Sequence, residues 1–136
     1  VAVVALTDDN KIVLEKQYRK AIDDVVLEIP AGKIEHDDDD IKGRARTELM
    51  EETGFDAKDI KLIHKSFPSV GYSKEEIYFY LATELTPGKP CTEEGENIEI
   101  LLIDFDEAYK MAKEGKFLDA KSTIGILIAY LNKYSE

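Results

Sequence analysis

The chain has 136 residues, of which 43% are hydrophobic and 35% charged, and its formal net charge is -11. This length and composition predict one folded domain with a hydrophobic core, and they exclude an intrinsically disordered chain. The negative charge argues against a general nucleic-acid or anionic-membrane surface. An acidic chain can still bind a phosphorylated substrate when divalent metal ions supply the positive charge.

The apolar runs and turn signals predict an α/β domain in which helices pack on a mixed β-sheet. Residues 7–10 read as a hairpin turn between the first two strands, and Asp40 and Gly54 read as the two caps of the first helix. In chain order we expect strands at 1–6, 11–19 and 24–30, a helix at 40–53, strands at 59–67, 75–85 and 98–105, and helices at 106–115 and 120–134.

The start of the chain and its cysteine content bear on its context. Val1 opens a strand already under way, so we expect residues 1–136 to be a single domain that lacks a small upstream β-segment. No stretch approaches the roughly 20 apolar residues of a membrane span, and no signal peptide is visible. The single cysteine, Cys91, excludes an internal disulfide and suits a reducing cytoplasm.

The helix predicted at 40–53 carries Glu48, Glu51 and Glu52 within an arc of about 100°. The last two lie just before the helix end, where the helix dipole disfavours anions, and the three carboxylates repel one another. The ordinary explanation of such a run is a solvated acidic face. The unfavourable position favours a site for Mg²⁺ or Mn²⁺ instead, because these ions prefer oxygen ligands and leave coordination sites for phosphate.

Residues 32–55 resemble the Nudix box, G-x5-E-x7-R-E-U-x-E-E-x-G-U, where U is a bulky apolar residue. Gly32 opens the match, and its far end is occupied by Glu48, Leu49, Glu51, Glu52, Gly54 and Phe55. The segments "EKQYRKA", "LEIPAGKIE", "FPSVGYSKEEIYFYLATELTPG", "EEGENIEI" and "DAKSTIGILIAYL" are similar to the ADP-ribose pyrophosphatase branch of that superfamily. The resemblance implies a Nudix-type α/β/α sandwich that hydrolyses ADP-ribose to AMP and ribose 5-phosphate with Mg²⁺ or Mn²⁺.

The match departs from the box at two positions. The loop after Gly32 is one residue longer than the pattern allows, so Asp39 aligns with the first Glu of the box and Thr47 with its Arg. In the family these two residues support the metal-binding glutamate, so the contacts behind the metal are expected to differ here. Arg44 and Arg46 are the nearby helix cations that could replace them.

The resemblance also implies roles for individual residues. Glu48 and Glu52 would be the main metal ligands, with the Ala31 carbonyl and Glu51 assisting. The acidic loop carries Glu93, Glu94 and Glu96, of which Glu94 and Glu96 are favoured as the base that activates the attacking water. The box glutamates, Glu51 among them, are the alternative source of that base, and the loop acids could instead be exposed charges.

Substrate contacts are expected from two further segments. Arg19 resembles an arginine that contacts the substrate phosphates or terminal ribose, although a surface ion pair would explain it equally well. The loop residues Ser69, Gly71 and Glu75 resemble a substrate loop, in which Gly71 could simply be a turn residue. Tyr18 or Tyr72 could stack on adenine, although aromatic residues beside strands usually belong to the core. His36 and His64 lack partners at metal-ligand spacing, so we read them as structural or exposed.

Two classes of function remain open. The first is a metal-dependent hydrolase of a nucleoside diphosphate linked to a second moiety, with ADP-ribose expected and another sugar nucleotide such as GDP-mannose as the alternative. The second is a Nudix-fold nucleotide-binding module that has lost catalysis, for which Thr47 and Asp39 are the best argument. The three retained glutamates favour the enzyme. We also expect a homodimer, because an exposed first strand would otherwise invite association.

Overall fold

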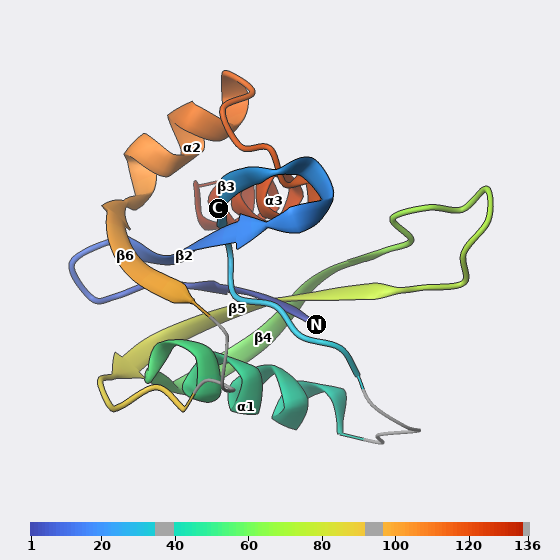
Figure 1. The fold of residues 1–136 in the computed structure, drawn as a ribbon. Helices are drawn as coiled ribbons and strands as arrows, with labels where there is room; N and C mark the ends of the chain where they lie inside the picture. The colour runs from blue at the N-terminus through green and yellow to red at the C-terminus, as the bar shows by residue number, and fades with distance from the viewer. Residues whose placement is uncertain (35–39, 92–96, 135–136) are drawn as a thin grey trace.

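The computed structural model describes residues 1–34, 40–91 and 97–134. Within these residues the strands form two three-stranded sheets, and helices lie on both sides of them (Figure 1). The elements are β1 (Ala2–Ala5), β2 (Lys11–Arg19), the 3-10 helix η1 (Lys20–Ile22), β3 (Asp24–Glu28), α1 (Ile41–Thr53), β4 (Asp56–Ser66), β5 (Ile77–Thr86), β6 (Ile98–Asp104), α2 (Phe105–Lys113) and α3 (Ala120–Tyr134). Every predicted helix and strand is present, and the bounds agree to within three residues.

The two sheets differ in their strand directions. One has the order β1-β5-β4, with β1 parallel and β4 antiparallel to β5, and the other has the fully antiparallel order β3-β2-β6. Helix α1 contacts β4 and β1, whereas α3 contacts β1 and α2 contacts β6. Figure 1 shows α1 on one side of the sheets and α2 and α3 on the other. This arrangement confirms the predicted α/β/α sandwich, with its strands divided between two sheets.

Strand β1 lies in the middle of the sandwich and is buried along its whole length. Its side chains alternate between two cores, as strand geometry requires. Val3 and Ala5 pack in the core beside α1, and Ala2 and Val4 pack in the core beside α2 and α3. No helix in the described residues is both long and apolar enough to span a membrane.

The position of β1 corrects two expectations. The turn at 7–10 forms, but the hairpin prediction was wrong, because β1 pairs with β5 and meets β2 through a single Leu6–Ile12 bridge. A strand that is apolar on both faces fits the centre of a sandwich rather than a hairpin with one solvated face. Nor is the first strand exposed, since the Val3 amide donates to the Pro30 carbonyl. The homodimer stays a prediction, but an exposed first strand no longer supports it.

Helix α1 begins and ends as predicted. The Asp40 carboxylate accepts a hydrogen bond from the Gly43 amide at 2.9 Å, which caps the first turn. Gly54 has φ 84°, a left-handed conformation, and its amide donates to the Met50 carbonyl. Ala45 and Leu49 are fully buried, so the adjoining acidic edge of the helix lies at the boundary of the core.

Candidate active site

The three box glutamates on α1 occupy three different environments. Glu48 is only 8% exposed, Glu52 is half-buried and Glu51 is exposed. Helix geometry explains why Glu51 alone is exposed, because Glu51 is rotated from Glu48 by about 60° toward solvent, whereas Glu52 is rotated by about 40° toward the core. Glu48 and Glu52 thus face inward as the predicted principal ligands would, and Glu51 lies at the rim.

Arg44 ties α1 to the loop that follows Gly32. Its guanidinium donates to Glu48 Oε1 at 2.6 Å and, through Nε, to the Lys33 carbonyl at 3.3 Å. Arg46 points elsewhere and forms a two-bonded pair with Asp56 at 2.6 and 2.7 Å. Of the two cations considered as replacements for the missing box arginine, Arg44 therefore holds the glutamate and the loop together.

Gly32 is required where the loop backbone meets Glu48. A Cβ atom at this position would overlap the Glu48 side chain at distances well inside van der Waals contact. The Gly32 amide donates to the Val1 carbonyl at 3.0 Å, and Ala31 forms a bridge with Ala2, so β1 fixes this backbone in place. The fold therefore sets the Ala31–Gly32 backbone directly against a buried carboxylate, as the prediction for Ala31 needs.

A further carboxylate, which the sequence analysis did not identify, comes from β2. Glu15 is only 2% exposed and lies beside Glu52, and no described residue forms a hydrogen bond with the buried Oε1 atom of either side chain. The signal in the sequence was weak: an acid directly follows the apolar run Ile12–Leu14 in a predicted strand. Finding its partner required the packing of α1 against the sheet.

Burial of these carboxylates changes their protonation. Burial raises the pKa of Glu15 to about 7, with the neighbouring Glu28 charge adding to the effect. Burial, followed by the contacts with Glu15 and Glu48, raises the pKa of Glu52 to about 10. Burial also raises the pKa of Glu48, although Arg44 opposes the rise. The metal-free protein therefore favours protonated carboxyl groups at this site.

Glu28 on β3 is a buried acid with the opposite behaviour. It accepts hydrogen bonds from Arg19 Nε at 2.7 Å, from Arg19 Nη2 at 2.9 Å and from Lys121 Nζ at 2.9 Å. Burial alone would raise the pKa of Glu28, but these bonds outweigh burial and hold the pKa below its usual value. Arg19 thus forms an ion pair with Glu28, as the alternative interpretation predicted. Lys121 of α3 is a second cation that pairs with the same Glu28 carboxylate.

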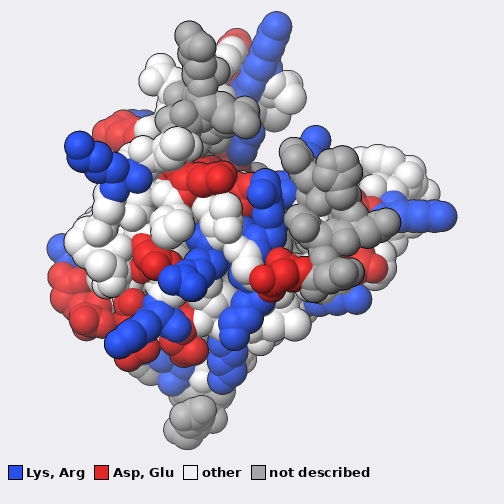
Figure 2. All heavy atoms as spheres, turned by 90° about the horizontal axis from the view of Figure 1, so that it is seen from below, with Lys and Arg blue, Asp and Glu red and all other residues white. Residues whose placement is uncertain are grey.

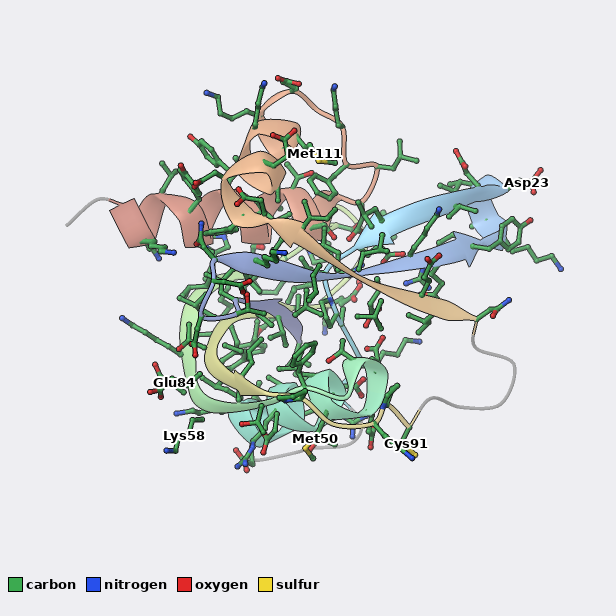
Figure 3. The ribbon with its side chains drawn as sticks, turned by 90° about the vertical axis from the view of Figure 1, so that its left-hand side faces the viewer. Asp23, Met50, Lys58, Glu84, Cys91 and Met111 are labelled. Atoms are coloured by element: carbon green, nitrogen blue, oxygen red, sulfur yellow. The ribbon has the colours of Figure 1, made fainter. Side chains whose placement is uncertain are left out.

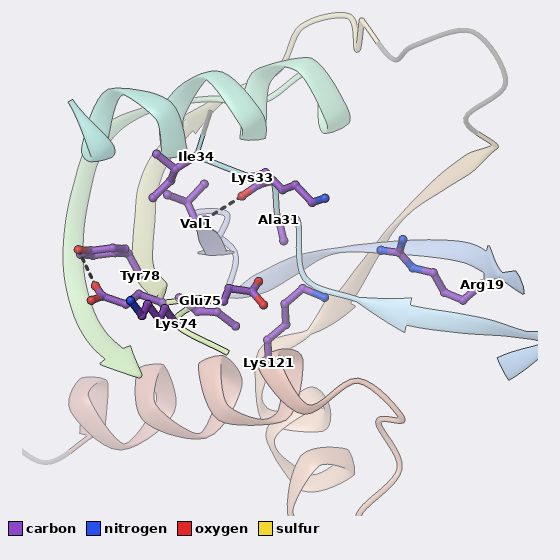
Figure 4. A pocket seen from close by; sticks show the side chains of 12 residues that line it. Val1, Arg19, Ala31, Lys33, Ile34, Lys74, Glu75, Tyr78 and Lys121 are labelled. Atoms are coloured by element: carbon purple, nitrogen blue, oxygen red, sulfur yellow. Dashed lines mark hydrogen bonds between the residues drawn. The ribbon is translucent and has the colours of Figure 1, made fainter. Parts of the chain in front are cut away.

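An open cavity of about 1000 Å³ adjoins this pair and the Gly32 loop. Its lining includes Arg19, Ala31, Gly32, Glu75 and Lys121. Figure 4 shows Lys121 from α3 and Arg19 from β2 on the side of the cavity nearest β3, with Ala31 close by. The cavity therefore places two cations beside the backbone that touches Glu48, which suits an anionic ligand.

The molecular surface near α1 is not uniformly negative, despite the net charge of -11. Figure 2 shows the face that carries α1, where acidic and basic side chains lie interspersed. Glu15 and Glu52 do not add to this surface, because the Oε1 atom of each is buried. An anionic substrate is therefore not opposed by a continuous acidic surface on this side.

The other predicted substrate residues are not gathered at the cavity. Glu75 lines it, but Ser69 and Gly71 lie in the loop between β4 and β5 and are absent from its lining. Their role stays a prediction. Tyr18 and Tyr72 are 52% and 89% exposed, so the core interpretation was wrong for both. His64 packs on Phe79 with ring centroids 5.6 Å apart, which fits the first of the two predicted alternatives, structural or exposed.

Several predicted residues lie outside the described ranges. They are His36, Asp39, Glu93, Glu94 and Glu96. Cys91, just before the acidic loop, is exposed, and its amide donates to the Glu51 carbonyl at 2.6 Å. Figure 3 shows Cys91 close to α1. The chain therefore enters the acidic loop from the end of the helix that carries the box glutamates.

The described residues suit a hard divalent cation without forming a finished site. In the described part of the chain no three His, Cys, Asp or Glu side chains are already spaced to hold one ion. Glu52 contacts both Glu15 and Glu48. Among the described residues the buried Oε1 atoms of Glu15 and Glu52 have no hydrogen-bond partner, and Gly32 leaves room for the Glu48 carboxylate. Oxygen donors of this kind fit Mg²⁺ or Mn²⁺.

Comparison with known proteins identifies the family of this chain. Residues 1–123 match the NUDIX domain family, so the chain belongs to that family. The chain is 36% identical over 128 residues to an ADP-ribose pyrophosphatase of Bacillus subtilis (strain 168), covering 93% of this chain and 69% of the relative. It is 35% identical, with the same coverage, to a methanol dehydrogenase activator of Bacillus methanolicus.

Two further matches fit the same picture. A GDP-mannose pyrophosphatase of Salmonella arizonae is 30% identical over 142 residues, covering 96% of this chain and 72% of the relative. The solved structure of an ADP compounds hydrolase superposes with a TM-score of 0.83 at 20% identity, covering 97% of this chain and 72% of that one, and it supports the fold. Together the matches confirm a Nudix pyrophosphohydrolase, and enzymes of this family generally depend on divalent metal ions.

The first testable prediction concerns the metal ligands. Replacing Glu48 or Glu52 with Gln should weaken Mn²⁺ binding and lower turnover by at least ~10²-fold, because each change removes a charged oxygen from the site. Both metal-free variants should be folded; Glu52→Gln should be slightly more stable, because Glu52 faces two other acids, whereas Glu48→Gln also loses the ion pair with Arg44. Calorimetric titration with Mn²⁺ and steady-state kinetics measure both effects. Wild-type turnover in both variants would rule out the assignment, and Glu99→Gln, an exposed acid on β6, is the control.

The second prediction tests the link made by Arg44. Arg44→Ala should weaken Mn²⁺ binding by about 10-fold, because Glu48 loses its ion pair and the Gly32 loop loses a contact. Arg46→Ala removes an equally well-paired arginine two residues away, and it should leave the metal affinity unchanged. Calorimetric titration of both variants makes the comparison. Equal effects of the two changes would show that Arg44 has no special role.

Proposed function

We propose that the chain hydrolyses ADP-ribose to AMP and ribose 5-phosphate, with Mg²⁺ or Mn²⁺ held at Glu48 and Glu52. One observation carries the proposal: the Ala31–Gly32 backbone, which packs against the Glu48 side chain, lines the same cavity of about 1000 Å³ as Arg19 and Lys121. A diphosphate could contact the cations while its oxygens approach the metal site. The similarity to a Bacillus subtilis ADP-ribose pyrophosphatase favours the adenine compound.

We assign metal binding and substrate binding to different residues of the site. A bound divalent ion would neutralise charge on the pyrophosphate and lower the pKa of a coordinated water. Glu48, Glu52 and the Ala31 carbonyl would hold that ion, with Glu51 assisting from the rim. Arg19 would present its guanidinium to phosphate or ribose oxygens, since Glu28 keeps the side chain in one orientation.

Lys121 is a second candidate for contact with the substrate. Its ammonium lies between Glu28 and Asp119, 2.9 Å from an oxygen of each, and it lines the same cavity as Arg19. Two acids hold it there, so its position does not depend on the substrate. A lysine fixed in this way could bind a phosphate oxygen as a point charge.

For the catalytic base we propose Glu94 or Glu96, with Glu51 as the alternative. The hydrogen bond from the Cys91 amide to the Glu51 carbonyl supports this choice, because it anchors the start of the acidic loop beside the box glutamates. A base must reach the attacking water directly or through one further water molecule. Glu51 is exposed and is therefore free to serve if the loop acids do not.

The alternatives rest on specific observations. GDP-mannose is the second candidate substrate, because several GDP-mannose pyrophosphatases are similar to the chain over most of its length. A binding module without catalysis is disfavoured by Arg44, which supplies a contact to Glu48 where the box arginine is replaced by Thr47. The cytoplasmic location, which Cys91 suggested, stays a prediction.

The third prediction tests the substrate. With Mg²⁺ and a panel of nucleoside diphosphate compounds, ADP-ribose should give AMP and ribose 5-phosphate, with a kcat/KM at least ~10-fold above that of GDP-mannose. Chromatography of the products at several substrate concentrations supplies the measurement. A preference for GDP-mannose would select the second candidate. Tight binding of ADP-ribose with no turnover of any compound would select the binding module and refute the proposal.

The fourth prediction concerns the base. Glu94→Gln or Glu96→Gln should lower kcat by ~10²-fold or more while KM for ADP-ribose stays within a few fold, because general-base catalysis acts on the chemical step. Glu93→Gln, in the same loop, is the matched control. If both variants keep wild-type kcat and Glu51→Gln loses it, the base belongs to the helix and not to the loop.

A further inference from the structure

The position of Glu15 on β2 turns its side chain toward α1. Side chains alternate along a strand, so Ile12 and Leu14 face the core beside α2 and α3, and Val13 and Glu15 face the opposite core. Glu15 lies directly opposite Glu28 of β3 on one side and Ile100 of β6 on the other. It is therefore in the central strand of its sheet, under the acidic edge of the helix.

Glu15 is almost completely buried and incompletely satisfied. It is 2% exposed, and within the described residues no hydrogen-bond donor reaches its Oε1 atom. Glu52, the side chain it faces, has a buried Oε1 in the same condition. Buried polar groups are nearly always paired, so two facing carboxylates with unsatisfied oxygens require an explanation.

The neighbouring cations are already engaged by other acids. Arg19 and Lys121 both bond to Glu28, and Arg44 bonds to Glu48. A purely structural role would be better served by an amide or an apolar side chain, because Val13 and Ile100 pack in the adjoining apolar core. Glu15 and Glu52 contact each other, and the Oε1 atom that each leaves without a partner in the described residues is suited to a cation.

We propose that Glu15 is a third protein carboxylate of the metal centre, contributed by the sheet in addition to Glu48 and Glu52 of α1. The inference rests on the proposed function in that Glu48 and Glu52 must be metal ligands. A hard divalent cation would take the unsatisfied oxygens and relieve the repulsion between Glu15 and Glu52. The ion would then join β2 to α1, two layers that each bring negative charge to the same place.

Metal binding by variants tests this directly. Glu15→Gln keeps the size of the side chain and removes its charge, so Mn²⁺ affinity measured by calorimetric titration should fall at least ~10-fold. Glu99→Gln neutralises an exposed acid on the neighbouring strand β6 and should bind Mn²⁺ like the wild type. A folded Glu15→Gln variant with wild-type affinity would overturn the inference and leave Glu15 as a structural acid.

A measurement on the wild-type chain removes dependence on how the variant folds. With ¹³C-labelled glutamate, diamagnetic Mg²⁺ should shift the carboxyl resonance of Glu15 together with those of Glu48 and Glu52, while that of the exposed Glu99 stays in place. An unchanged Glu15 resonance beside shifted Glu48 and Glu52 resonances would refute the inference and preserve the metal site. If none of the three resonances shifts, the proposed metal site itself fails and the inference fails with it.

Discussion

Repulsion among buried carboxylates is the constraint on which the rest of this structure depends. α1 brings Glu48 and Glu52 to the core boundary, and β2 brings Glu15 to the same place from the opposite layer. Apolar contacts of Ala45, Leu49 and β1 hold the two layers together, so the acids cannot separate without disturbing the core. Such a cluster weakens the metal-free fold unless protons or cations neutralise it.

The distribution of cations shows which carboxylates the protein neutralises itself. Glu28 has Arg19 and Lys121, and Glu48 has Arg44, but Glu15 and Glu52 share no described donor at Oε1. The carboxyl cluster is linked through the Gly32 backbone to a cavity lined by Arg19 and Lys121, and these two cations are held in place by Glu28 and Asp119. This arrangement explains how a chain with a net charge of -11 can bind a diphosphate. A metal ion at the carboxylates and the two cations of the cavity would contact the diphosphate oxygens from two sides.

Local signals predicted much of the fold and half of the site. Asp40 and Gly54 marked the ends of α1, and the spacing of Glu48, Glu51 and Glu52 marked the edge for which we propose metal binding. Contacts between elements far apart in sequence were not predicted. Glu15 and Lys121 were missed for this reason, because each reaches the candidate site only through the packing of such elements. The hairpin expected at 7–10 failed for the same reason, because the turn residues do not determine which sheet β1 joins. Arg44 was one of two candidates, and only the structure showed that Arg46 is engaged by Asp56.

The stability of the chain with and without metal tests this account most directly. The pKa values of Glu52 and Glu15 in the folded state, about 10 and about 7, lie above their ordinary value of 4.5. The folded metal-free protein then binds more protons than the unfolded chain above about pH 4.5, so its stability should fall as the pH rises from 5 to 8. Chemical denaturation in EDTA and in saturating Mg²⁺ at both pH values measures the free energy of unfolding. The account predicts that Mg²⁺ stabilises the protein, and more at pH 8 than at pH 5; no stabilisation at either pH would contradict it.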